Sequence, residues 1–409
     1  MKGAIEKLLG SVRPHFYGEG KLKWAWPLHE GLETFLLTSS EKTHQDSHVR
    51  DPMDMKRLMI FVVFAILPAM IAGMWNIGHQ GFLGEGNTAD AASIVQCFLR
   101  GAWHMLPIVI VSYTAGGIWE LLFCIVRKHE INEGFLVTGL LFPLTLPPTI
   151  PLWMVAVGVS FGVVIGKEVF GGTGFNVLNP ALTARAFAFF AFPAAMSGTG
   201  SVWNVAGKWN PFTAYAEPIQ GFTGATPLLA ISAAGRGGDP LAALAAEHWT
   251  WTDAFLGNIP GSMAESSALA ILIGAGMLIV TGIGSWRIMV SCVLGLVVTT
   301  GILSQVAGPE SMAIMHLPPH YHLVVGGFMF GAVYMATDPV SAAQTQVGRW
   351  IYGFGIGAMV GLIRVFNPAY TEAVMMAILF MNVFAPLIDY VVIQRSTRRR
   401  VARLAAQGG

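Results

Sequence analysis

The sequence predicts an all-α polytopic membrane protein with about ten transmembrane helices, arranged as two inverted five-helix repeats with broken helices. Three observations support this prediction: the shortage of charge, the long apolar runs and the placement of the basic residues. Hydrophobic residues make up 54% of the 409 positions and charged residues only 11%, whereas soluble domains carry about 25% charged residues. Because so few charges cannot cover a surface exposed to water, we expect lipid to be the main solvent of this chain.

Apolar runs long enough to cross a bilayer, roughly 20 residues each, recur along the chain. The third and fourth are short and meet at a proline-rich break at 147–151. Such a break removes helical hydrogen bonds that lipid cannot replace, so it must be buried in protein or line a cavity. The predicted spans lie near 57–75, 104–126, 134–150, 152–169, 176–193, 267–284, 286–306, 321–337, 349–366 and 370–393.

The basic residues predict the orientation, because lysine and arginine gather at the cytoplasmic ends of membrane helices. The arginine-rich tail places the C-terminus in the cytoplasm, and an even number of spans then places the N-terminus there too. The segments near 76–103 and 194–266 face outward. The first fifty residues lack the apolar core of a signal peptide, so we expect insertion to rely on the first membrane helix. The basic residues of the tail are Arg395, Arg398, Arg399, Arg400 and Arg403.

The expected organisation has five parts. They are a cytoplasmic N-terminal segment (1–56), a first membrane repeat (57–193), an outward loop region (194–266), a second membrane repeat (267–393) and a basic cytoplasmic tail (394–409).

Self-comparison indicates an internal duplication. Residues 139–142 are echoed by 327–330, and Asn-Pro-Ala-Leu-Thr at 179–183 by Asn-Pro-Ala-Tyr-Thr at 367–371, with the same offset. Five helices per copy is an odd number, so the copies would have opposite orientations. This is the plan of many transporters, whose sites lie on broken helices at the repeat interface. The alternative is a pair of copies retained only for packing.

A glycine- and threonine-rich stretch, Gly-Phe-Thr-Gly-Ala-Thr-Pro-Leu, occupies 221–228 in the long outward region. By composition it predicts either a turn that enters the apolar run 228–231 or a specialised site. Thr223-Gly224-Ala225-Thr226 resembles the flavin-attachment motif Ser/Thr-Gly-Ala-Thr of the B-type and C-type subunits of sodium-translocating NADH:quinone oxidoreductases and of Rnf complexes. In that family a flavin transferase esterifies the phosphate of FMN to the last threonine, so the resemblance implies covalent FMN on Thr226.

The resemblance extends over nearly the whole chain, and the long N-terminal segment favours the B-type subunit over the related D-type subunit of Rnf complexes. It implies a complex of the bacterial inner membrane that passes electrons through FMN and riboflavin to ubiquinone and exports sodium. Expected partners are the bilayer, the flavin transferase, a flavinylated C-type subunit and an NADH-oxidising subunit, but no nucleic acid. NADH should bind another subunit, since this chain has no dinucleotide fingerprint. The segments that carry the resemblance are 21–37, 48–59, 132–135, 146–149, 166–174, 179–181 and 336–340.

A second glycine-rich turn, 171–174, lacks the strand and the Lys-Ser/Thr ending of a nucleotide loop. It is either a tight turn between helices or a contact for a flavin or a partner. The family carries a non-covalent riboflavin in its B-type subunit, and flavin rings need amide hydrogen bonds. The candidate contacts near this turn are Thr173, Asn176, Asn179 and Pro180.

Acidic residues in or beside membrane spans are costly and usually functional. We expect Asp338, Asp389 and Glu133 to contribute to a sodium pathway, because sodium is a hard cation that prefers oxygen ligands. Two of them have alternative roles: Asp338 precedes Pro339 and fits a helix stop, and Glu133 can simply face water. Asp389 is the hardest to explain otherwise, because apolar residues separate it from Arg395. Glu168 can pair with its neighbour Lys167. The histidines and the three isolated cysteines show no metal-binding or redox spacing.

Two further classes of protein fit parts of the sequence. One is the D-type subunit of Rnf complexes; the other is a secondary transporter without a redox cofactor, for which inverted repeats and broken helices are equally suitable. The feature that separates the two transport mechanisms is Thr226, because a plain transporter does not need a flavin acceptor.

Overall fold

The computed structural model describes the chain except for residues 1, 18–19, 28, 31–32, 34–54, 87–92, 129–130, 132–133, 198–201, 208–224, 368–369 and 408–409. The described residues are helical and contain no β-strand. Six helices among them are long and apolar enough to cross a membrane. The prediction of an all-α polytopic membrane protein is therefore confirmed.

Every one of the ten predicted spans contains helix. The first five correspond to α3 (Met55–Gly84), α4 (Ile94–Arg127), α5 (Gly134–Leu144), α6 (Leu152–Val164) and α7 (Pro180–Ala191). The last five correspond to α12 (Ala268–Val280), α13 (Trp286–Val306), the broken segment α14–α15–η4, α16 (Gln346–Phe366) and α17 (Val374–Gln407). Several start where the sequence supplies a cap: the side chain of Asn179 accepts backbone N–H groups at the start of α7, and that of Thr345 does so at the start of α16.

Shorter helices connect or flank these spans. They are α1 (Lys2–Phe16), η1 (Lys23–Ala25), η2 (Glu168–Phe170), α8 (Pro193–Ser197), α9 (Pro227–Ala233), α10 (Pro240–Ala246), α11 (Trp251–Leu256) and η3 (Ala313–His316).

The first helix break lies between α5 and α6, at the prolines that predicted it. Residues 144–148 are buried. Two of the carbonyls freed by the break accept hydrogen bonds from the backbone. Ala264 N donates to Leu144 O at 3.0 Å, and Met263 N donates to Leu146 O at 3.2 Å. The segment that precedes α12 thus runs into the bundle and satisfies the break with its own backbone, as a low-dielectric interior requires.

The second break divides the eighth span, which the sequence predicted as one helix over 321–337. Here α14 (Pro319–Val324) ends before Gly326, whose positive φ of +72° suits glycine. The chain restarts as α15 (Phe328–Phe330) and continues as a π-helix, η4 (Gly331–Met335). The prediction of a single helix was wrong, because a continuous apolar run conceals a turn made by Gly326 and Gly327.

Packing within the two predicted repeats is similar. In the first, α4 packs on α6 and α6 on α7; in the second, α13 packs on α16 and α16 on α17. The two copies meet where α3 contacts α12 and where α7 contacts α17. These equivalent contacts favour the duplication over a chance match of short motifs.

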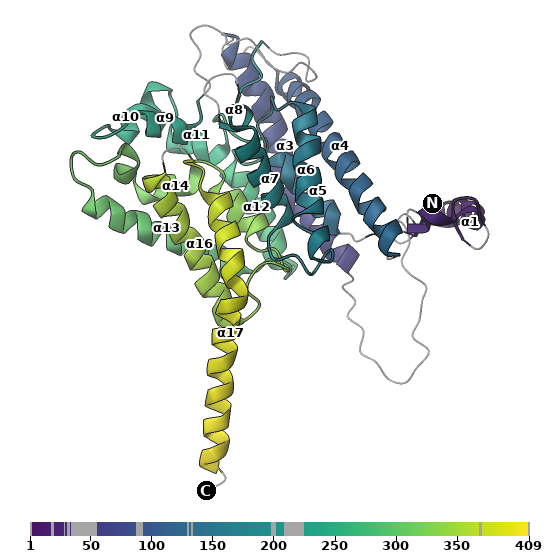
Figure 1. The fold of residues 1–409 in the computed structure, drawn as a ribbon. Helices are drawn as coiled ribbons and strands as arrows, with labels where there is room; N and C mark the ends of the chain where they lie inside the picture. Colours follow the sequence, from purple (N-terminus) through teal and green to yellow (C-terminus); the bar gives the residue numbers. More distant parts are fainter. Residues whose placement is uncertain are drawn as a thin grey trace.

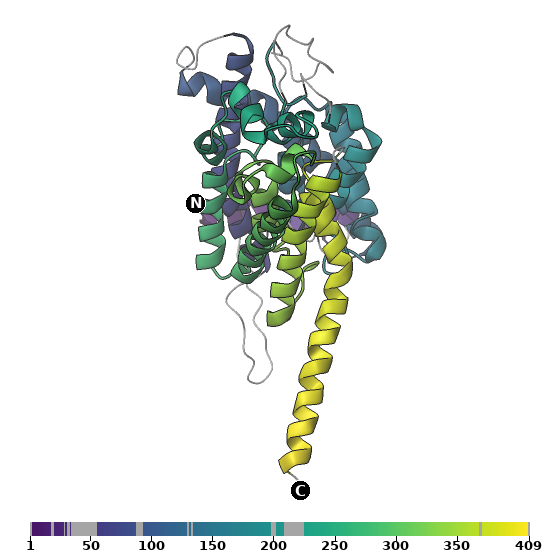
Figure 2. The ribbon, with the colours of Figure 1, turned by 90° about the vertical axis from the view of Figure 1, so that its left-hand side faces the viewer.

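The two ends of the bundle carry different helices. Figures 1 and 2 show the helices α9, α10 and α11 at one end, while α17 projects from the other end as a single long helix. With 34 residues, α17 is much longer than the predicted span 370–393 and includes the basic tail.

The segment around Gly207 is tied to the bundle by Glu85, which pairs with Arg100 at 2.5 Å and accepts from Gly207 N at 3.0 Å. Burial alone would raise the pKa of Glu85, but the contacts with Arg100 and Gly207 N together have the larger effect. The pKa of Glu85 therefore lies below its usual value.

Candidate cofactor and ion sites

Thr226 lies at the start of α9 and is its N-cap. Its side-chain oxygen accepts a hydrogen bond from Leu229 N at 3.3 Å, and Pro227 occupies the first helical position. The residue is buried, while Ala225 is half-buried; Thr223 and Gly224 lie outside the described residues. A phosphoester would keep the oxygen that caps the helix, so the capping role is compatible with attachment of FMN. The apolar run 228–231 lies in the short helix α9, while residues 221–224 of the predicted turn lie outside the described residues.

The helix that begins at Thr226 packs on the second helix break. A Cβ built on Gly326 would lie 2.5 Å from Leu228 Cδ1. Leu228 and Ile231 belong to an apolar cluster that includes Val324 and Val325 of the broken segment. Thr226 therefore sits two residues from a direct contact between the 194–266 region and the second repeat.

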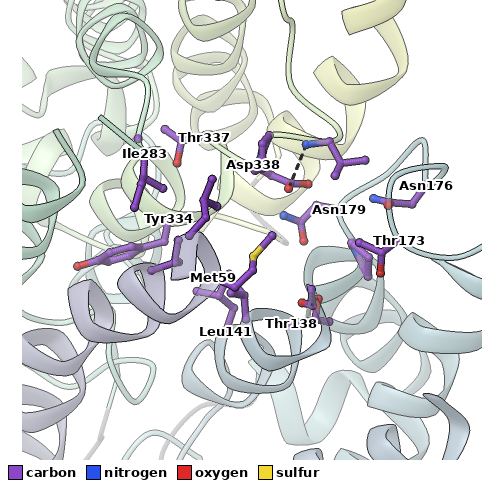
Figure 3. Close-up of a pocket in the computed structure, with 18 of the residues that line it drawn as sticks. Met59, Thr138, Leu141, Thr173, Asn176, Asn179, Ile283, Tyr334, Thr337 and Asp338 are labelled. Atoms are coloured by element: carbon purple, nitrogen blue, oxygen red, sulfur yellow. Dashed lines mark hydrogen bonds between the residues drawn. The ribbon is translucent and has the colours of Figure 1, made fainter. Parts of the chain in front are cut away.

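A pocket lies between the two predicted repeats and brings together all four residues predicted for riboflavin (Figure 3). Thr173, Asn176, Asn179 and Pro180 line it from the first repeat, and Asp338 lines it from the second. Mostly apolar side chains from α3, α5 and α12 form much of the remaining wall, and Thr138, Lys167, Tyr334 and Thr337 also line the pocket. The polar part of the wall is thus grouped near the 166–180 loop and the end of η4.

The amide groups in this pocket already have local partners. Asn176 Nδ2 donates to Leu178 O at 2.9 Å, and Asn179 Oδ1 accepts from Ala181 N at 3.0 Å and Leu182 N at 3.3 Å. The cavity volume is about 70 Å³, enough for several water molecules at about 10–15 Å³ each. A cavity of this size holds water but not a flavin ring, so binding of riboflavin here would require the lining side chains to move apart.

Asp338 borders a second cavity of about 200 Å³ that lies beside the first. Arg287 and Arg349 line this second cavity with the Thr337–Pro339 turn. Ser341 Oγ donates to Asp338 Oδ2 at 2.6 Å and Val340 N donates to Oδ1 at 3.3 Å. Asp338 therefore both stops the helix and places a carboxylate between two cavities, so the two interpretations from the sequence do not exclude each other.

Asp389 does not reach this pocket. Its carboxylate accepts from Gln344 N at 2.7 Å, from Thr345 N at 2.9 Å and from Thr345 Oγ1 at 2.5 Å. It thus fixes the turn that starts α16. Glu133, the third acidic residue predicted for the pathway, lies outside the described residues.

A buried charge cluster adjoins the pocket at Lys167. Lys167 Nζ pairs with Glu120 of α4 and, at 3.3 Å, with Glu168, which also pairs with Arg127 at 3.0 Å. Two cations and two carboxylates are therefore neutralised together, which is the usual condition for burying charge. The pairing of Glu168 with Lys167 expected from the sequence is observed.

Sequence analysis missed two deeply buried ion pairs, that of Lys167 with Glu120 and a second one between Arg185 and Glu265. Arg185 of α7 binds Glu265 through two parallel contacts, at 2.8 Å and 3.2 Å, and both side chains are about 95% buried or more. Arg185 and Glu265 are 80 residues apart, and Glu265 lies before the predicted span 267–284. No local sequence pattern therefore connects them. The only signal of this pair was a glutamate directly before an apolar run. In the described part of the chain no group of three His, Cys, Asp or Glu side chains is placed to hold a metal ion.

Comparisons with known proteins agree with this architecture. A model of the NQR2, RnfD, RnfE family matches residues 42–398. The chain belongs to this family. Its relatives include proteins named as the B-type subunit of Na(+)-translocating NADH-quinone reductase from Pseudomonas paraeruginosa, 45% identical over 419 residues, and from Azotobacter vinelandii, 46% identical over 419 residues. The match covers 98% of this chain and 99% of each relative. A relative of the same name from Klebsiella pneumoniae is 46% identical over 427 residues.

Proposed function

We propose that this chain is the B-type membrane subunit of a sodium-translocating NADH:quinone oxidoreductase. The near full-length similarity to relatives of that name carries the proposal. In this function Thr226 holds FMN through a phosphoester, riboflavin binds non-covalently, ubiquinone accepts the electrons and sodium moves outward. The other subunits supply NADH oxidation, and a flavin transferase attaches the FMN. The flavins supply the electron chemistry, while the protein binds and orients them.

The geometry around Thr226 supports the FMN part of this proposal. The residue is at the end of the bundle opposite the projecting α17 (Figure 1), and its backbone is fixed by the α9 cap. A tether on a rigid element holds a cofactor in a narrower range of positions than a tether on a loop. The contact between Leu228 and Gly326 then joins the tether to a broken membrane helix.

The pocket between the repeats supports the ion part. Asp338 faces it together with Asn179 and Thr337, and the adjoining cavity connects it toward Arg287 and Arg349. Oxygen ligands beside a helix break at a repeat interface are the arrangement that secondary transporters use for sodium. We therefore assign Asp338 to the uptake side of the sodium pathway, with riboflavin bound against the same wall once the pocket widens.

The direct test is in-gel flavin fluorescence after co-expression with a flavin transferase. The native chain is expected to fluoresce after denaturation, and Thr226→Ala to be dark. Thr281→Ala, which removes a threonine hydroxyl from a helix end elsewhere in the chain, is the matched control and should fluoresce as the native chain does. A dark native chain, or fluorescence that survives Thr226→Ala, would contradict the flavin assignment and leave a transporter without a redox cofactor.

A further inference from the structure

A groove on the outside of the bundle lies between the start of α16 and the middle of α17. Asp389 holds its two walls together, because the carboxylate accepts hydrogen bonds from the backbone N–H groups of residues 344 and 345. The groove has a volume of about 810 Å³, which is within the range of ligand sites in proteins. Its apolar walls are formed by Val347, Ile351, Leu387, Ile388, Val391 and Val392.

The face of α17 that lines this groove changes from apolar to basic along the helix. One stripe of lining residues, at steps of three or four, consists of Ile388, Val392, Arg395, Arg399 and Arg403. Arg398 does not line the groove, because a step of one residue turns a side chain by about 100° around the helix. The preference of basic residues for the cytoplasmic side explains arginines at this end of α17. It does not explain why they continue an apolar groove.

Aromatic side chains mark the level of the membrane interface beside the groove. Trp350 of α16 packs edge-to-face on Trp286, with the ring centroids 5.8 Å apart, and Tyr390 of α17 is exposed. Tryptophan and tyrosine gather where the lipid headgroups begin. The apolar part of the groove therefore faces hydrocarbon, and Arg395 and Arg399, farther along α17, lie at the level of the headgroups. Figure 1 shows this part of α17 leaving the bundle.

The arginines of this stripe lack a counter-charge in the part of the chain that the structure describes. The sequence contains no aspartate or glutamate after Asp389. The Asp389 carboxylate is occupied by the backbone at 344 and 345 and by Thr345 Oγ1 at 2.5 Å. The ion pairs among the described residues are made by other side chains. Like charges three or four residues apart on a helix repel one another, so an anion placed among them would be stabilised.

We propose that this groove binds one anionic phospholipid of the leaflet at the α17 end of the bundle. The acyl chains lie along the apolar walls, and the phosphate lies among Arg395, Arg399 and Arg403. Arginine suits this role because its guanidinium group binds phosphate oxygens through two parallel N–H bonds. A basic cluster directly beyond a membrane helix is also the arrangement that attracts anionic headgroups. A lipid fits better than an acidic segment of another protein, because the groove is apolar at the level of the hydrocarbon and basic only beyond it.

The test is titration of the delipidated full-length chain in detergent with phosphatidylglycerol, followed by native mass spectrometry. Phosphatidylcholine with the same acyl chains is the reference lipid, because it has the phosphate but no net charge. We expect one phosphatidylglycerol per chain to bind more tightly than phosphatidylcholine. Arg399→Gln should weaken it about fivefold, because one arginine near an anionic lipid surface contributes about 1 kcal/mol. Arg398→Gln, which removes the same charge from the adjacent position outside the groove, is the matched control and should bind as the native chain does.

Two results would overturn the proposal. Equal affinities of the native chain for the two lipids would leave the groove to a protein partner. Equal weakening by Arg398→Gln and Arg399→Gln would show that only the net charge of α17 matters. Both arginines are exposed, so their glutamine variants should keep the native unfolding temperature, and a lost lipid would not reflect a misfolded chain. The measurement involves neither flavin nor sodium, so its outcome is independent of the proposed function.

Discussion

At the scale of single residues, several buried charged side chains form ion pairs with residues from distant parts of the chain. Lys167 illustrates this, since it is 3% exposed and lies between Glu120 of α4 and Glu168 of its own loop. Its Nζ also donates to Thr173 Oγ1 at 3.4 Å. One lysine therefore ties α4 to the loop that lines the pocket between the repeats.

Replacing this lysine tests how far the ion cluster stabilises the fold. Lys167→Met leaves the buried Glu120 without its Lys167 partner, and breaking a buried pair in this way costs about 3–5 kcal/mol. We expect a clearly lowered thermal unfolding temperature of the chain in detergent. Adding Glu120→Gln to Lys167→Met should restore part of the loss, because the unpaired charge is then removed. Lys128→Met, at an exposed lysine at the end of the same α4, should change little; an unaltered unfolding temperature in Lys167→Met would contradict this role.

Sequence analysis was informative at this scale only where a local pattern existed. Thr226 was singled out because four consecutive residues resemble a known motif, and Asp338 because an acidic residue stood beside a proline in an apolar run. Glu265 and Glu372 had no such signal. Their partners, Arg185 and the backbone of Gly327, lie 80 and 45 residues away, so only the folded chain brings them together.

At the scale of elements, the side chain of Asp389 shows how one helix fixes the start of another. It belongs to α17 but accepts hydrogen bonds from the backbone at 344 and 345, where α16 begins. In the sequence it stood out as an acidic residue inside an apolar helix, which predicts an ion pathway. Its three hydrogen bonds provide a structural reason for the same acid.

Asp389→Asn separates the structural role from the ion-pathway role. The new amide group would face the N–H of Gln344 or Thr345, so a donor would meet a donor and about 1 kcal/mol of stability should be lost. We expect a lowered unfolding temperature, with unchanged affinity in equilibrium binding of radioactive sodium to the purified chain in detergent. Arg395→Gln, in an exposed position farther along α17, should alter neither. If Asp389→Asn weakened sodium binding at native stability, Asp389 would belong to the pathway after all.

The helices themselves could be predicted largely from hydropathy, because each apolar run of spanning length contains helix. The boundaries were less accurate where glycine interrupts an apolar run. The pair Gly326-Gly327 was visible in the sequence, yet the run 321–337 is apolar on both sides of it. Whether such a pair bends the chain depends on partners for the freed backbone, and these are Arg364 and Glu372 from elsewhere in the chain.

At the scale of the whole molecule, the predicted duplication pairs the turn between α5 and α6 with the turn that follows η4. A further correspondence follows the offset of the two predicted repeats: Thr149 and Pro151 at the first break match Thr337 and Pro339 in the turn that follows η4. The first break has Ile150 between them and is closed by the backbone of Met263 and Ala264. The turn that follows η4 has Asp338 in the equivalent position and borders two cavities. The copies have thus diverged, and of these two turns only the second presents a carboxylate.

The sidedness of the membrane is the last prediction, and it follows from the basic residues of α17. The three cysteines, Cys97, Cys124 and Cys292, are buried, so single exposed cysteines can be labelled over a low background. Glu247 caps the end of α10, and Glu310 precedes Ser311, whose carbonyl accepts from Gly237 N between α9 and α10. We expect Glu247→Cys and Glu310→Cys, both exposed, to react with a membrane-impermeant maleimide in intact cells. Arg398→Cys should react only after the cells are permeabilised, because arginine-rich ends stay in the cytoplasm. Labelling of Arg398→Cys in intact cells would invert the orientation and place Thr226 on the cytoplasmic side.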